Sequence, residues 1–253
     1  MKSALLRMAL LLTAGLALLA VTQLTPVVLR EIDAFRVRRV EVAGARWFTA
    51  AAAVQTAGIT PTTNLFDDPA PWLERLRANP LVVDVRIGRR LPGTLVLHVR
   101  EAVPVAFART PELRPIAADG RVLPADIPLG RMDLPVLSLR TRVSGAARAV
   151  DPETLRVLRF LDRAAELEPG LIGWVSEAGV HGSAIRLVLR NAADAEVLID
   201  PEPTAERLRE LNMTLGELAG ADSAGAAPEL SRVRRIDVRF HDQVVVSLHE
   251  RKS

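Results

Sequence analysis

Side chains able to bind a metal or carry out acid–base chemistry are few in this sequence and lie far apart. The four histidines form no i, i+4 pair and have no neighbouring carboxylate at metal-ligand spacing: His98, His181, His241 and His249. His98 lies on the polar side of an alternating strand pattern, which favours a solvated side chain over a metal ligand. The sequence contains no cysteine, so disulfides and thiolate metal sites are excluded. We therefore expect neither a metal site nor a bound cofactor.

Signals for a catalytic nucleophile or a phosphate-binding loop are also weak. Ser183 follows His181 and Gly182 but lacks the glycine beyond it that a nucleophile elbow requires. No glycine-rich loop is followed by the lysine that would bind a phosphate. Acidic residues such as Asp67 and Asp68 precede a predicted helix, where capping explains them. A site built from distant residues stays open at this point, but we expect a protein that is not an enzyme.

The distribution of charge argues against a nucleic-acid partner. The chain has 253 residues, with 33 Lys and Arg against 30 Asp and Glu and 4% aromatic residues. Nucleic-acid binding favours a one-sided basic face with aromatic stacking platforms, whereas here charges of both signs are interspersed. With 49% hydrophobic residues, the chain is long enough for two small domains and one further segment. We expect neither nucleic acid nor a small-molecule substrate as a partner.

An uncharged stretch near the start of the chain predicts a membrane anchor. Met8 to Leu29 is 22 residues without a charge, about 33 Å as a helix, which is enough to cross a bilayer. A cleaved signal peptide would need a shorter apolar core and a better cleavage site than residues 18–20 provide. We expect a short cytoplasmic tail at 1–7, a transmembrane helix at 8–29 and a body outside the cytoplasmic membrane. Arginines follow the span as well as precede it, so charge alone leaves the orientation open.

Residues 35–108 show the pattern of a strand, two short helices and a β-hairpin. Val40 and Val42 alternate with polar residues, and a phase shift before them predicts either a bulge or a late strand start near Arg38. The hairpin strands are predicted by two further alternating patterns, at 81–87 and 95–99. Between them, Pro92–Gly93 predicts a type II turn with the glycine at positive φ. The three strands are expected to form one sheet with both helices on one face.

Capping signals set the ends of the two helices. Thr49 can cap a helix over Ala50–Ala57, which Gly58 then ends. Asp68, placed before a proline, predicts the start of the second helix. This helix is expected to end before Asn79–Pro80, because the residue before a proline avoids the helical region.

A second, β-rich region follows, at 105–250, with helices that begin near Asp151 and Thr204. Strands are expected at 136–139, 172–176, 184–189 and 196–199. The chain then ends in a hairpin, whose last strand could lie at the edge of the sheet and dock another chain. We therefore expect an α+β protein with a transmembrane helix at 8–29, a β-α-α-β-β domain at 35–104 and a β-rich domain with two helices at 105–250.

This order of elements, together with several short motifs, resembles the FtsQ/DivIB family of bacterial cell division proteins. In the first domain the motifs are Val40–Gly44, Asn79–Val82, Arg90–Leu95 and Glu101–Ala106. Asp119–Val122 and the terminal Ile236–Phe240 match later motifs of the family. The resemblance covers nearly the whole chain. Leu81 stands where the family often has an aromatic residue, and Ile199–Pro201 replaces a usual glycine.

The resemblance implies a POTRA domain at 35–104 and a non-enzymatic, single-pass scaffold at the division septum. It also implies binding of small coiled-coil membrane proteins, FtsB and FtsL, through the last strand, while the POTRA domain helps to recruit the complex. The implied partner-binding residues are Phe240, Val244, Val245, Val246, Ser247 and Leu248. Two alternatives remain at this point, another POTRA-containing assembly or secretion component and a membrane-anchored cell-wall hydrolase.

Overall fold

The computed structural model describes residues 28–109, 112–125, 127, 133–138, 151–190, 192, 195–220, 229–240 and 243–249. The predicted tail at 1–7 and all but the last two residues of the predicted span at 8–29 lie outside these ranges. Among the helices of the described ranges, none has both the length and the apolar character that a membrane crossing requires. The contacts divide the chain into two compact units, Met1–Glu101 and Ala102–Ser253.

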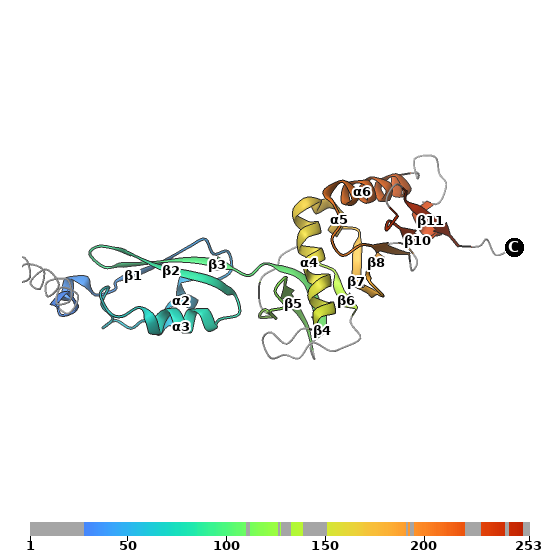
Figure 1. The fold of residues 1–253 in the computed structure, drawn as a ribbon. Coiled ribbons are helices and arrows are strands. Elements are labelled where there is room, and N and C mark those ends of the chain that lie inside the picture. Colours follow the sequence, from blue (N-terminus) through green and yellow to red (C-terminus); the bar gives the residue numbers. More distant parts are fainter. Residues whose placement is uncertain are drawn as a thin grey trace, which may run out of the picture. The chain divides into compact units, whose positions relative to one another are not determined.

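The first unit is a three-stranded sheet with two helices on one face (Figure 1). After a single 3-10 turn, η1 (Asp33–Phe35), its elements are β1 (Arg39–Ala43), α2 (Ala50–Ala57), α3 (Ala70–Ala78), β2 (Val82–Arg90) and β3 (Thr94–Glu101). The strand order is β1-β3-β2, with β1 parallel and β2 antiparallel to β3. The core between the sheet and the helices includes Ala53, Leu65, Trp72, Leu76, Val85, Leu95 and Leu97.

The first helix and the late strand start agree with the sequence. The Thr49 hydroxyl accepts a hydrogen bond from the Ala52 amide at 3.2 Å, and Gly58 ends α2 with φ at +69°. A side-chain acceptor and a left-handed glycine therefore define the two ends of this helix. Strand β1 begins at Arg39, after the phase shift.

Two local predictions in the first unit are wrong. Helix α3 begins at Ala70 with Pro69 as its N-cap, so Asp68 is not the cap. Its Oδ1 instead accepts from the Ala70 amide at 3.0 Å, two residues further along the chain. The hairpin turn is not type II, because Gly93 does not have a positive φ; the Leu91–Pro92 peptide bond is cis. A glycine fits this position because the backbone of Arg36 passes close to it: a Cβ at position 93 would lie 2.8 Å from the Arg36 carbonyl oxygen.

The second unit is an eight-stranded mixed sheet in the order β11-β10-β9-β8-β7-β6-β4-β5. Its strands are β4 (Pro104–Arg109), β5 (Leu113–Ala117), β6 (Val136–Ser138), β7 (Val175–His181), β8 (Ala184–Leu189), β9 (Glu196–Ile199), β10 (Val233–Asp237) and β11 (Val245–Leu248). Its helices are α4 (Pro152–Leu167), α5 (Pro169–Ile172), α6 (Ala205–Gly220) and the 3-10 turn η3 (Glu229–Arg232). The predicted strand at 172–176 is wrong in its first half, where the chain forms α5 and β7 begins only at Val175.

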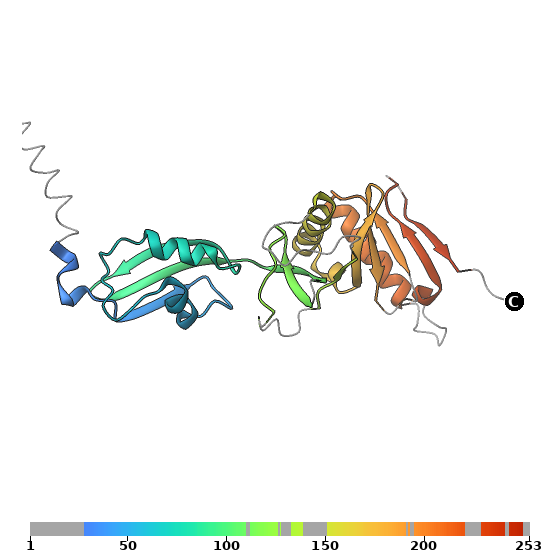
Figure 2. The same cartoon turned by 90° about the horizontal axis from the view of Figure 1, so that it is seen from below.

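Helices α4 and α6 pack on one face of this sheet. Apolar residues of both helices belong to a single buried cluster with the inward residues of the strands, among them Leu158, Leu161, Leu208, Leu211, Leu187, Val197 and Ile236. In Figure 2 the orange and red strands lie in front of α6. The opposite face carries charged pairs across neighbouring strands, such as Arg235 on β10 with Glu196 on β9. The alternation of apolar and polar residues that the sequence shows therefore separates the two faces.

Candidate functional site

The residues first considered for chemistry do not come together in the structure. His98 lies on β3 in the first unit, while His181 and His249 lie at the ends of β7 and β11, and all three are exposed. His241 is outside the described residues. Within the described ranges no group of three histidine, aspartate or glutamate side chains is placed to hold a metal ion. These histidines therefore do not form a common site in the described part of the chain.

One edge of the eight-stranded sheet is already covered by its own chain. The residues after β5 turn back along it, so that the Ala117 amide donates to the Arg121 carbonyl at 3.0 Å and the Leu123 amide to the Pro115 carbonyl at 2.8 Å. The Arg114 guanidinium also donates to the Leu123 carbonyl, at 2.9 Å. Pro115 has no backbone N–H to offer a further strand. This edge is therefore protected against pairing with another chain.

The other edge is β11, which pairs only with β10 among the described strands. The His249 amide donates to the Arg232 carbonyl at 2.9 Å, towards the β10 side. Backbone groups alternate in direction along an antiparallel strand, so Val245 and Ser247 also point towards β10. The N–H and C=O groups of Val246 and Leu248 must therefore point away from the sheet. They offer pairing sites for one more strand.

The side chains of this edge are unusually apolar for an exposed strand. The exposed fractions are 39% for Val245, 37% for Val246, 50% for Leu248 and 47% for Phe240, and Ser247 is also exposed. Val244 is half-buried and packs against the hydrophobic cluster. Four of the six predicted residues thus lie on the edge strand with accessible side chains, Phe240 is exposed in the turn that leads into it, and Val244 lies partly in the core. Exposed apolar strands at a sheet edge are sites where another chain can bind.

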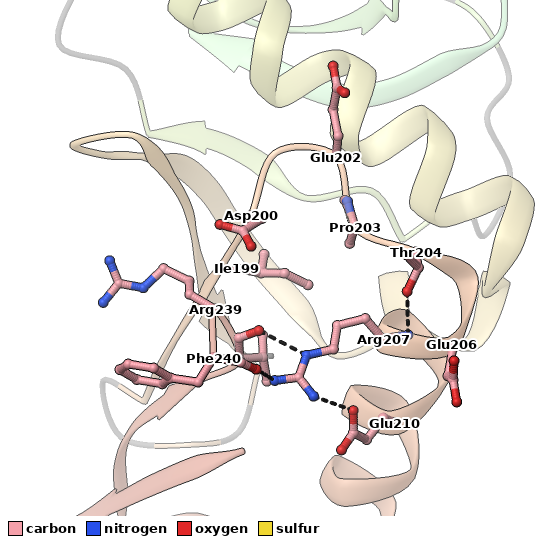
Figure 3. Close-up of a pocket in the computed structure, with 11 residues that line it drawn as sticks. Ile199, Asp200, Glu202, Pro203, Thr204, Glu206, Arg207, Glu210, Arg239 and Phe240 are labelled. Carbon is pink, nitrogen blue, oxygen red and sulfur yellow. Dashed lines mark hydrogen bonds and ion pairs between the residues drawn. The ribbon is translucent and has the colours of Figure 1, made fainter. Parts of the chain in front are cut away.

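A cavity of about 700 Å³ lies beside this edge, where β9, β10 and the start of α6 meet. Arg207 reaches from α6 to the backbone of the segment that leads into β11 (Figure 3). It donates to the carbonyl oxygens of Val238 at 3.0 Å and Gln243 at 2.7 Å, to that of Phe240, and to the carboxylate of Glu210. One side chain of α6 therefore holds both ends of the turn between β10 and β11.

Arg207 was not recognised in the sequence, although one signal was available. It lies in the first turn of α6, where the helix macrodipole disfavours a cation. An arginine at such a position indicates an anionic or carbonyl partner outside the helix. Its carbonyl partners lie 31 to 36 residues further along the chain, so the sequence alone does not identify them.

The end of β10 carries a second fixed arginine. The Arg239 Nε donates to Asp237 Oδ1 at 2.9 Å, and the Arg239 amide donates to the same oxygen at 3.1 Å. These bonds hold the pKa of the Asp237 carboxyl below its usual value, outweighing the opposite effect of burial. The remaining charged residues around the cavity are Asp200, Glu202, Glu206 and Glu210. The cavity is therefore a polar site next to the turn that leads into β11, and Phe240 lines it.

Comparisons with known proteins find relatives among bacterial cell division proteins. Residues 35–102 match the family model described as "POTRA domain, FtsQ-type". The chain is 30% identical over 134 residues to "Cell division protein FtsQ" of Syntrophotalea carbinolica, a match that covers 52% of this chain and 48% of that relative. It is 28% identical over 230 residues to "Cell division protein FtsQ" of Rhodothermus marinus, covering 85% of this chain and 78% of that relative. The first match thus spans about half the length of the relative, and the second extends into the β-rich region.

Proposed function

We propose that this chain, which belongs to the FtsQ/DivIB family of bacterial cell division proteins, is a non-enzymatic scaffold of the division machinery that captures partners through β11. The observation that carries the proposal is the asymmetry of the eight-stranded sheet. The β5 edge is covered by residues 121–123, whereas β11 presents apolar side chains and outward backbone groups that pair with no strand in the described ranges. An edge left open in this way is suited to strand addition.

The partner we propose is a small coiled-coil membrane protein of the FtsB/FtsL type. An extended segment of it would pair with the outward backbone groups of Val246 and Leu248. Its side chains would cover the exposed apolar residues of β11, and a polar or charged side chain could enter the cavity beside Phe240. The POTRA domain would serve a separate recruiting role towards other components of the division machinery.

We further propose a single-pass topology in the cytoplasmic membrane, at the division septum. In this arrangement residues 1–7 lie in the cytoplasm, 8–29 cross the membrane, and the body lies outside. The body would comprise a POTRA domain at 35–104 and a β domain at 105–250. The 22 uncharged residues from Met8 to Leu29 and the family of the chain support this arrangement.

Proline substitution at an outward position tests strand addition. Val246→Pro removes an N–H that points away from β10, so the β10–β11 pairing is retained. The loss of one hydrogen bond, with a partner carbonyl left unpaired, amounts to about 3 kcal/mol or about 100-fold in affinity. Binding of the full-length chain to a purified FtsB/FtsL-type pair, both in nanodiscs, would be measured by a titration.

Two further variants serve as controls. Val246→Thr keeps the backbone N–H and a branched side chain, so its affinity is expected to stay within about threefold of the parent chain. Leu248→Pro removes the other outward N–H and is expected to weaken binding as Val246→Pro does. Hydrogen exchange of the Ser247 amide reports whether β11 still pairs with β10. Unchanged affinity in both proline variants would exclude β11 as the docking strand.

A further inference from the structure

The end of the predicted membrane span is bonded directly to the first unit. The Asn64 side chain, only 3% exposed, donates to the carbonyl oxygens of Leu29 at 3.3 Å, Arg30 at 3.0 Å and Ile32 at 3.2 Å. The Arg30 Nε also donates to the Phe66 carbonyl at 2.8 Å. Leu29 is the last residue of the uncharged stretch. The loop between α2 and α3 therefore lies where the chain would leave the membrane.

The turn between β2 and β3 lies close to this attachment. The Val37 amide donates to the Thr63 carbonyl at 2.8 Å, and the Arg38 amide donates to the Gly93 carbonyl at 2.8 Å. Segment 36–38 thus runs between the loop and the turn, as a central strand runs between its two neighbours. The loop and the turn are therefore about two strand spacings apart, or about 10 Å. Figure 1 shows the tip of the β2–β3 hairpin at the same end of this unit as the blue helical turn at 28–30.

Basic and apolar side chains gather at this turn, in a group we call the arginine tip: Arg38, Arg39, Arg90 and Leu91. All four are exposed, with Leu91 at 60% and the Arg90 side chain at 65%. Arg39 and Arg90 both pair with Thr94 in the sheet register, so their side chains share a face. In the described part of the chain no ion pair involves Arg38 or Arg39, and Arg90 pairs with Glu41 at 2.9 Å.

The acidic residues of this end are mostly engaged elsewhere. Asp33 pairs with Arg36 at 2.8 Å. Asp67 accepts from the Asn64 amide, and Asp68 accepts from the Ala70 amide. The arginine tip is therefore a positively charged group with an exposed leucine, held near the predicted exit of the chain from the membrane.

We propose that the arginine tip docks on the anionic phospholipid headgroups of the membrane that holds residues 8–29. This inference rests on the membrane anchor of the proposed function. Guanidinium groups bind phosphate oxygens in a two-pronged geometry, and a headgroup surface attracts arginines within about 10 Å of it. The Leu91 side chain enters the membrane interface between the lipid headgroups. The POTRA domain is then held at a fixed orientation against the bilayer.

The chain has no cysteine, so a single label can report the depth of the tip. Leu91→Cys in the full-length chain would carry a bimane fluorophore in nanodiscs containing headgroup-quencher lipid, with or without phosphatidylglycerol. Ala78→Cys is the matched control, because it is exposed at the end of α3. Nine residues of β2 separate that end from the turn, a distance of about 30 Å. We expect strong quenching at position 91 in anionic discs, and little at position 78 or in uncharged discs.

The combined variant Arg38→Gln and Arg39→Gln tests the charge. Each arginine near an anionic surface favours the docked orientation about fivefold, so the docked-to-undocked ratio is expected to fall about 30-fold. A chain that fails to enter nanodiscs would overturn the anchor, and the docking with it. A chain that enters, but with position 91 unquenched or equally quenched in uncharged discs, would overturn the docking alone. Quenching that persists in the double variant would have the same consequence.

Discussion

Asn64→Asp is the substitution that most directly tests how the first unit is held to the segment before it. The two side chains have the same shape, but aspartate replaces the amide that donates to three carbonyl groups with a second oxygen. It keeps an acceptor for the Phe66 amide, which donates to Asn64 Oδ1 at 3.0 Å. The change therefore removes the attachment to residues 29–32 and leaves the local turn intact.

The size of the effect follows from the number of donors. An amide has two N–H groups, so at most two of the three contacts can be full hydrogen bonds. Leu29, Arg30 and Ile32 are at least partly exposed, and their carbonyl groups can bind water once they are released. Each lost bond then costs about 1 kcal/mol, and the new carboxylate is also repelled by the same carbonyl oxygens, so the total cost is at least about 2 kcal/mol. That is at least about a 30-fold increase in the population with this attachment open.

Amide hydrogen exchange of the full-length chain in nanodiscs measures this population. The informative amides are Val37, bonded to Thr63 at 2.8 Å, and Leu65, bonded to Phe35 at 2.9 Å. Both are expected to exchange faster in Asn64→Asp, whereas amides of α4 in the second unit serve as an internal control. Asn64→Ala removes the acceptor as well as the donors. If Asn64 served only the Phe66 amide, alanine would open this region and aspartate would not, and that order of effects would refute the reasoning.

Three further substitutions have defined outcomes, each read from the urea unfolding of the full-length chain. Glu101→Gln is expected to destabilise the first unit by about 2 kcal/mol, because one carboxylate accepts the backbone N–H groups of residues 46–48 and a glutamine has a single oxygen. Gly93→Ala is expected to cost about 1–3 kcal/mol through the contact with the Arg36 oxygen. Asp237→Asn is expected to lower the stability of the folded chain above pH 3.8, the ordinary pKa of the group, because the pKa of Asp237 is lower in the folded state. The difference in stability is expected to disappear as the pH falls from 3.8 through the folded-state pKa. A difference that does not depend on pH would contradict this.

Features set by neighbouring residues were predicted well from the sequence. Helix α2 was predicted with its correct ends, since Thr49 and Gly58 act on backbone groups within one turn of themselves. Strands β8 and β9 also match their predicted bounds. In each case the signal and the structure it determines lie within a few residues.

Features set by distant contacts were predicted poorly. Pro92–Gly93 carries the signal of a type II turn, but its backbone is adapted to segment 36–39, which lies more than 50 residues earlier and donates two hydrogen bonds to the Gly93 carbonyl. Arg207 was missed for the same reason, because its partners lie on a strand and turn beyond the end of α6. The sequence predicted that β11 could be an edge, and only the structure places the covering segment 121–123 on the opposite edge.

The contacts behind β11 bear on how strongly an open edge can bind. Arg207 ties the turn before β11 to α6, and Arg239 is bonded to Asp237 at the end of β10. The strand that a partner would extend is therefore fixed before the partner arrives, and ordering it adds little to the entropic cost of binding. Only the incoming segment has to become ordered, at about 1–2 kcal/mol per residue. A four-residue edge such as β11 can compensate for this cost only if apolar contacts add to the backbone pairing, and its exposed valine and leucine side chains provide them.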